Sequence, residues 1–230
     1  MRLRFFFFPA LTMLIAVVIG FGSVVSGANQ AGAVTPDQAA RGLGHATPEG
    51  PFTQTSSGGE YTCGLRPSGK AVCWGLNTDG QAKNKPGPFT QIAAGGFHTC
   101  GLRPSGKAVC WGNNEFGQAK NKPGPFTQIA AGGFHTCGLR PSGKAVCWGY
   151  NKYGQAKDKP GPFTQIATGA YHTCGLRPSR KAVCWGNNKR GQANDKAGPF
   201  TQITAGGQHT CGLRPSGEAV CWGYNTDGQA

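Results

Sequence analysis

The sequence predicts an all-β protein, and more narrowly a β-propeller, from three observations: a repeat, a hairpin signature and an unusual composition. A repeat with a period of 37 residues occurs five times, the last copy being five residues shorter, and it places tryptophan at positions 74, 111, 148, 185 and 222. A fixed period of this kind is typical of arrays in which each repeat is one structural unit. With 39 glycines and only 14% charged residues, the chain is poor in helix formers and rich in turn formers.

Each repeat carries the signature of a β-hairpin, seen in the second copy as Arg-Pro-Ser-Gly-Lys at residues 103–107. Pro and Ser suit the corners of a three-residue loop, and Gly supplies the left-handed conformation that such a loop needs. With the loop at residues 104–106, Leu102 pairs with Ala108, and Cys100 lies directly opposite Cys110. The two cysteines therefore share one face of the hairpin.

Three strands are expected in each copy, over residues 90–94, 98–103 and 107–111 of the second. A fourth segment, starting at Gln118, is interrupted by Pro-Gly and is an edge strand at most. Three or four short strands per repeat fit one blade of a β-propeller. The propeller is expected to span residues 51–230, with the copies at 51–87, 88–124, 125–161, 162–198 and 199–230.

The N-terminus predicts export from the cell. Two arginines precede an apolar run from residue 5 to about 25, and small residues follow, which is the pattern of a signal peptide over residues 1–33. The run is also long enough to hold the chain in a membrane uncut, so a retained anchor is the alternative. Residues 34–50 have no helical or strand periodicity and are expected to form a flexible leader.

All ten cysteines belong to the repeats, two in each copy. In an exported chain, an even count with one pair per unit predicts disulfide bonds. The expected pairs are Cys63–Cys73, Cys100–Cys110, Cys137–Cys147, Cys174–Cys184 and Cys211–Cys221. The alternative is a metal site formed by His98, Cys100 and Cys110, which lacks a fourth ligand. Neither a metal nor a cofactor is therefore expected.

Three recurring motifs resemble a known family. They are Ala-Gly-Gly-Phe-His-Thr-Cys-Gly-Leu, Gly-Lys-Ala-Val-Cys-Trp-Gly and Asn-x-x-Gly-Gln, and they resemble the regulator of chromosome condensation repeat over residues 51–230. The short period is similar to the bacterial branch that includes secreted type II β-lactamase inhibitory proteins. The resemblance implies a propeller. Because members usually have seven blades, five copies imply a ring that is open or incomplete.

Most of the recurring side chains are expected to be scaffold. The histidines at 98, 135, 172 and 209 suggest catalysis, yet copy one has Tyr61 there with no other change, which favours a structural role. The Asn of each Asn-x-x-Gly-Gln motif is expected to bond its own turn. The tryptophans are expected to form the core between blades, with carbohydrate stacking as the alternative.

The near-identical copies differ mainly at three places: before the His, after Trp-Gly and inside the last turn. Strands alternate in direction, so these loops emerge on one face. Aromatic residues collect there, which predicts a protein-binding surface with aromatic anchors. The predicted contacts are Phe97, Phe116, Phe134, Tyr150, Tyr153, Tyr171 and Tyr224. The family resemblance implies the same use, because the inhibitory proteins touch their targets at matching positions.

The leading hypothesis is therefore a secreted, non-enzymatic protein that binds another protein. An enzyme is disfavoured because nine acids and the repeated histidines offer no asymmetric acid–base pair. The net charge of +14 supports an alternative, a propeller that binds an acidic polysaccharide or the cell envelope through its opposite face. The residues expected to carry that binding are Lys83, Lys85, Lys120, Lys122, Lys157 and Lys159.

Overall fold

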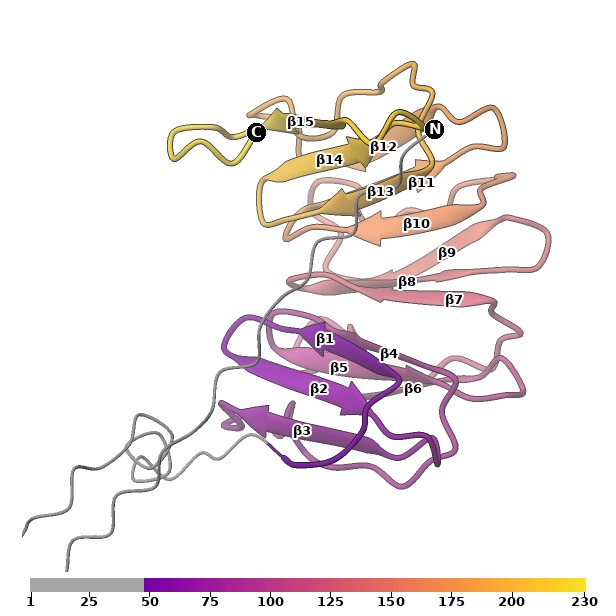
Figure 1. Cartoon of the computed structure of the whole chain (residues 1–230), viewed down its shortest axis with the longest axis vertical. Helices are drawn as coiled ribbons and strands as arrows, with labels where there is room; N and C mark the ends of the chain where they lie inside the picture. The colour runs from indigo at the N-terminus through magenta and orange to yellow at the C-terminus, as the bar shows by residue number, and fades with distance from the viewer. Residues whose placement is uncertain (1–47) are drawn as a thin grey trace, which may run out of the picture. The chain divides into compact units, whose positions relative to one another are not determined.

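The computed structural model describes residues 48–230; the predicted signal peptide and most of the predicted leader lie outside this range. Five three-stranded antiparallel sheets follow one another in chain order (Figure 1). Across residues 48–230 there is no helix of the length and apolarity that crossing a membrane requires. The strands are β1 (Gln54–Ser57), β2 (Tyr61–Leu65), β3 (Ala71–Gly75), β4 (Gln91–Ala94), β5 (His98–Leu102), β6 (Ala108–Gly112), β7 (Gln128–Ala131), β8 (His135–Leu139), β9 (Ala145–Gly149), β10 (Gln165–Thr168), β11 (His172–Leu176), β12 (Ala182–Gly186), β13 (Gln202–Ala205), β14 (His209–Leu213) and β15 (Ala219–Gly223).

Each repeat forms one propeller blade, and we number the blades 1 to 5 from β1–β3 to β13–β15. The hairpin register predicted from the sequence is confirmed, because Leu102 pairs with Ala108 and Cys100 with Cys110. The glycine at the third loop position has a positive φ of 77° at residue 106. In blade 4 this position is Arg180, which adopts the same left-handed conformation at φ 64°.

The path of the chain gives each blade two ends. The β1–β2 loop and the turn directly after β3 (residues 76–80), with their equivalents in the other blades, emerge at one end, which we call the variable face. The rest of the β3–β4 connector returns to the other end, where the Phe89 backbone N–H donates to the Gly69 carbonyl. The hairpin loops at residues 66–70, 103–107, 140–144, 177–181 and 214–218 lie at the other end, which we call the tip face. The predicted fourth strand is reduced to a single bridge, such as the one between Ala108 and Lys122.

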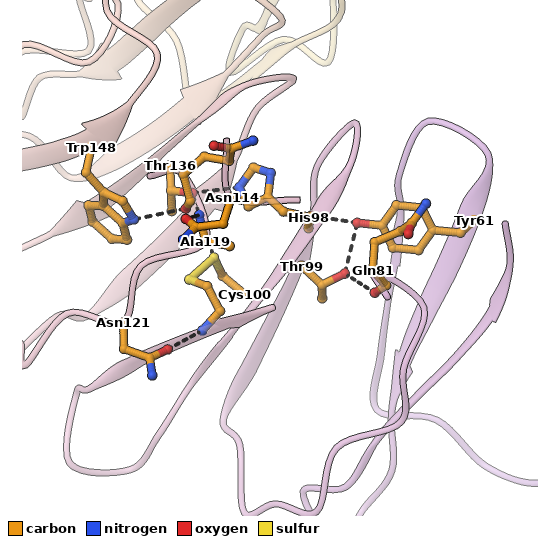
Figure 2. The surroundings of a disulfide bond; sticks show 12 residues. Tyr61, Gln81, His98, Thr99, Cys100, Asn114, Ala119, Asn121, Thr136 and Trp148 are labelled. Carbon is orange, nitrogen blue, oxygen red and sulfur yellow. Dashed lines mark hydrogen bonds between the residues drawn. A yellow bond between two sulfur atoms is a disulfide. The ribbon is translucent and has the colours of Figure 1, made fainter. Parts of the chain in front are cut away.

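The core lies between consecutive blades. Phe89, Ile92 and Trp111 of blade 2 are buried against Cys63 and the aliphatic residues of blade 1, and the same arrangement recurs along the array. Trp111, Trp148, Trp185 and Trp222 are only 6–7% exposed, so the predicted core role is confirmed, and carbohydrate stacking on these four rings is excluded. In two blades the indole also donates a hydrogen bond to the preceding blade, as from Trp148 Nε1 to the Gln118 carbonyl (Figure 2).

Candidate functional site

The repeated histidines connect blades rather than forming a reactive site. The Nε2 atom of His98 is 2.7 Å from Thr136 Oγ1 of the next blade, and His135 and His172 make the same contact. Burial lowers the pKa of His98 to about 4 and that of His172 to about 4. Burial, with a further contribution from the flanking histidines, lowers the pKa of His135 to about 3. These side chains are neutral and inaccessible near pH 7, as a structural role requires.

Tyr61 takes the place of the histidine in blade 1 and bonds the next blade in a different way. Its hydroxyl donates to the His98 carbonyl oxygen at 2.6 Å and accepts a hydrogen bond from Thr99 Oγ1 (Figure 2). Burial raises the pKa of Tyr61 to about 12. The interface between blades therefore tolerates either side chain, provided that a polar atom reaches the neighbouring strand.

All five predicted disulfides are present, and none of the described cysteines is free. The proposed metal site at His98, Cys100 and Cys110 is thereby excluded, because both sulfurs are bonded to each other and the histidine faces Thr136. Nor do residues 48–230 contain any other cluster of three possible metal ligands.

Six of the seven aromatic residues that the sequence singles out lie together on the variable face. We call Phe97, Phe116, Phe134, Tyr150, Tyr153 and Tyr171 the aromatic cluster. Phe134 is at its centre, with ring centroids 5.4 Å from Phe97 and 5.3 Å from Tyr171. Since these residues come from blades 2, 3 and 4, the cluster is continuous across three repeats.

Tyr150 joins the residues before the histidines to those of the last turns. Its ring is 4.9 Å from Phe116, 6.3 Å from Tyr153 and 6.1 Å from Tyr171. A hollow of about 140 Å³ lies among four rings of the cluster, which are those of Phe116, Phe134, Tyr150 and Tyr171. Phe97, Phe116 and Tyr153 at the edge remain 41%, 40% and 38% exposed. The cluster therefore offers both exposed rings and a depression between them.

Tyr224 lies apart from this cluster. Its ring is covered by the guanidinium group of Arg190, whose central carbon is 5.1 Å from the ring centroid. The two residues belong to blades 5 and 4, so this pair extends the aromatic surface by a cation–π contact rather than by ring packing.

A feature that the sequence reasoning missed is the hollow beside the cluster. The loops before the histidines approach one another and line a space of about 340 Å³ with small residues from all five blades, Gly59, Gly96, Gly133, Ala170 and Gly207 among them. The signal was present in the sequence, because a small residue directly precedes each variable position. A partner loop would meet little steric hindrance there.

The lysines predicted for the opposite face are not all found there. A Cβ atom built on Gly80 would lie 3.1 Å from Lys83 Cε, and Lys120 and Lys157 approach Gly117 and Gly154 in the same way. These three side chains fold back onto the turns of the variable face. The other three are half-buried, with ammonium groups 5.7–5.9 Å from tryptophan ring centroids, and they are Lys85, Lys122 and Lys159. The prediction that all six form one basic face is therefore wrong.

Comparisons with known proteins agree with this architecture. The model of the regulator of chromosome condensation (RCC1) repeat matches the chain five times, at residues 52–81, 89–118, 126–155, 163–192 and 200–229. No curated protein sequence matches the chain.

Among solved structures, the chain is similar to the ectodomain of the receptor kinase CR4 from Physcomitrella patens, with 30% identity and a TM-score of 0.69 over 80% of this chain and 55% of that one. It is also similar to the ectodomain of ACR4 from Arabidopsis thaliana, with 27% identity and a TM-score of 0.62 over 76% and 66%. The fold is shared with yeast RCC1 (Prp20) bound to Kap60, at 20% identity and a TM-score of 0.65 over 83% and 58%. The chain spans between about half and two thirds of the length of these proteins.

Proposed function

The chain belongs to the regulator of chromosome condensation repeat family, and on that premise we propose that it is a secreted, non-enzymatic protein that captures another protein through its aromatic cluster. The observation that carries the proposal is the continuity of this cluster across blades 2, 3 and 4, at positions where the repeats diverge. Exposed aromatic rings of this kind are the usual anchors of protein interfaces.

The surroundings of the cluster fit a protein partner. Blades 1 and 2 contribute three acids to the variable face, Glu60, Asp79 and Glu115, together with Lys83 and Lys120. Blades 3 and 4 contribute only basic charged side chains there, which are Lys152, Lys157, Lys189 and Arg190. An apolar centre between one flank that carries three acids and another flank that is wholly basic orients an incoming partner and favours one docking direction. Asn113 stabilises the acidic flank, because its side-chain amide donates to Asp79 at 3.3 Å while its oxygen accepts from Gln118.

Secretion is supported by the five disulfides, which persist in oxidising compartments. It is also consistent with the two similar ectodomains, which belong to receptor kinases. The resemblance to inhibitory proteins makes β-lactamases a sensible first target to assay. The wider proposal does not depend on that target.

A capture experiment tests the proposal with substitutions that the repeats themselves supply. Phe116→Asp copies residue 79 of blade 1, and Tyr150→Asn copies residue 113 of blade 2, so both changes occur naturally in this blade framework. We expect the immobilised wild-type chain to retain a defined protein from the producer's culture medium, and the double variant to lose it. Lys107→Gln on the tip face is the control and should retain it. Retention by the double variant, or no specific retention by the wild type, would contradict the proposal.

A further inference from the structure

The tip face carries one Lys and, at the start of the hairpin loop, one Arg in each of blades 1 to 4, and these four arginines are already engaged. Blade 4 also carries the exposed Arg180 inside its loop. Arg103 lies over the Phe89 ring, 4.4 Å from its centroid, and donates to the Pro88 carbonyl at 3.4 Å. The same two kinds of contact recur at Arg66, Arg140 and Arg177. The groups left to meet a ligand are therefore the exposed lysines at the end of the hairpin loops of blades 1 to 4 and, in blade 4, Arg180.

These lysines divide into two pairs. In blades 3 and 4, Lys144 Nζ is 3.4 Å from Asp158 Oδ2, and Lys181 Nζ is 3.7 Å from Asp195 Oδ2. The equivalent acid positions in blades 1 and 2 are Asn84 and Asn121. Within residues 48–230, Lys70 and Lys107 have no acidic group at ion-pair distance.

Asn84, Asn121, Asp158 and Asp195 all accept the same backbone hydrogen bond in their blades, so these positions differ in charge and not in structural role. Asn121 Oδ1 accepts a hydrogen bond from the Cys110 backbone N–H at 2.8 Å, drawn as the dashed line at Asn121 in Figure 2. In blade 1, Asn84 Oδ1 accepts the equivalent bond from the Cys73 backbone N–H. Asp158 and Asp195 make this hydrogen bond with Oδ1 at 3.0 and 2.9 Å and use Oδ2 for the lysine. The repeats therefore hold a neutral or an acidic residue in one fixed position beside each tip lysine.

The uncompensated charges of blades 1 and 2 lie on neighbouring hairpins. The Phe89 backbone N–H donates to the Gly69 carbonyl of the blade 1 loop at 2.9 Å, and Arg103 binds the adjacent Pro88. Lys85 lies in the same connector between the two blades, with its ammonium group 5.9 Å from the Trp111 ring centroid. Lys70 and Lys107 thus lie on adjacent hairpins with Lys85 in the connector between them, and we call these three residues the lysine row.

We propose that the lysine row binds an acidic polysaccharide through its carboxylate or sulfate groups. Lysines on flexible stems act as point charges and suit a chain with repeated, singly charged groups. Among the described residues, the large exposed apolar side chains are Leu76, Phe97, Phe116, Tyr153 and Leu213, so no aromatic ring projects from the tips of blades 1 and 2. A face without exposed rings lacks the stacking platform that single-stranded nucleic acid uses and the anchors that proteins use.

Heparin affinity chromatography and binding titrations with heparin test this assignment on the full chain. Lys70→Gln with Lys107→Gln should weaken binding roughly fivefold, on the basis of two exposed ion pairs of about 0.5 kcal/mol each. Lys144→Gln with Lys181→Gln changes the net charge equally but removes lysines that are already paired, so it should have a much smaller effect. Asn84→Asp with Asn121→Asp should weaken binding, because it gives Lys70 and Lys107 the aspartate partners that Lys144 and Lys181 have. Asp158→Asn with Asp195→Asn should strengthen binding, because it frees Lys144 and Lys181.

Two controls keep the outcome decisive. Thr78→Asp with Thr226→Asp adds the same negative charge on the variable face and should have a small effect on heparin binding. Equal effects from the two lysine pairs, or from this control, would overturn the lysine row in favour of bulk charge, and absence of heparin binding would overturn the site. If a single-stranded DNA oligonucleotide binds more tightly than heparin at the same ionic strength and shows the same mutational pattern, the assignment to polysaccharide is wrong.

Discussion

The interior between blades and the variable face are built from the same repeat, yet they tolerate change very differently. His98, His135 and His172 are identical in type and contact the next blade's threonine at 2.7–2.8 Å. The residues one position earlier in the five copies are Glu60, Phe97, Phe134, Tyr171 and Gln208. An interior residue must match a partner on the neighbouring blade, whereas its sequence neighbour faces solvent and other variable residues. The comparison teaches that the repeat can change its exposed surface without changing its core.

The largest effect that we expect from this comparison is a loss of stability in the interior between blades as the pH falls. Because burial depresses the pKa of three interior histidines, the folded state resists their protonation, while in the unfolded chain they bind protons near pH 6.5. The stability that they contribute is complete above about pH 6.5 and is lost as the pH falls toward 4. We expect the free energy of unfolding to drop by several kcal/mol over this interval, on the order of 2–3 kcal/mol for each histidine.

Urea unfolding at a series of pH values measures this loss. His172→Tyr copies residue 61 of blade 1 and should make the pH dependence shallower without unfolding the chain. A stability that stays constant between pH 7 and pH 4 would show that these histidines are not held neutral in the interior.

A second difference concerns how tightly each region is packed. A Cβ atom at residue 101 would lie 2.5 Å from the Phe89 ring, so Gly101→Ala should destabilise the fold by about 3 kcal/mol. Gly207, on the variable side of blade 5, has nothing within 4 Å of such an atom, and Gly207→Ala should change stability by less than about 0.5 kcal/mol. Chemical denaturation of both variants checks the contrast, and equal effects would contradict it.

A smaller change in stability than that of Gly101→Ala is expected at one hairpin loop. Arg180 has a φ of 64°, where four other copies have glycine, so Arg180→Gly should stabilise the chain by about 1 kcal/mol. Thermal unfolding measures the change. A lower melting temperature for the variant would mean that the arginine side chain compensates for its strained backbone.

The parts of the fold that the sequence could predict are those set by local geometry. The Pro-Ser-Gly loop determines which residues pair across the hairpin, so Cys100 opposite Cys110 followed from loop length. The five disulfides followed from that register and from the presence of one cysteine pair in each copy. The period of two along a strand likewise placed Trp111 on the face opposite the cysteines and in the core between blades. Residues before and after alternating strands had to emerge on one face, which anticipated the contacts of Phe97 and Phe134.

The sequence failed where the chain is irregular. Lys83, Lys120 and Lys157 lie in connectors without a repeating strand geometry, so no period indicated that they fold back onto the variable face. The engagement of Arg103 with Phe89 and Pro88 was equally hidden, because it depends on how one blade's connector meets its own hairpin. As a result, the basic residues most available for binding are the tip lysines and Arg180, which the sequence reasoning did not select for binding.

The most direct test of the binding proposal measures binding and stability together on one variant, Phe97→Ala with Phe134→Ala. Phe97 is 41% exposed and both rings pack mainly on other residues of the aromatic cluster, so we expect a modest loss of stability. Affinity for the captured protein should fall at least about 100-fold, as for the loss of two interface anchors. Unchanged affinity in a folded variant, or unfolding of the variant under native conditions, would contradict the assignment of this cluster as the binding surface.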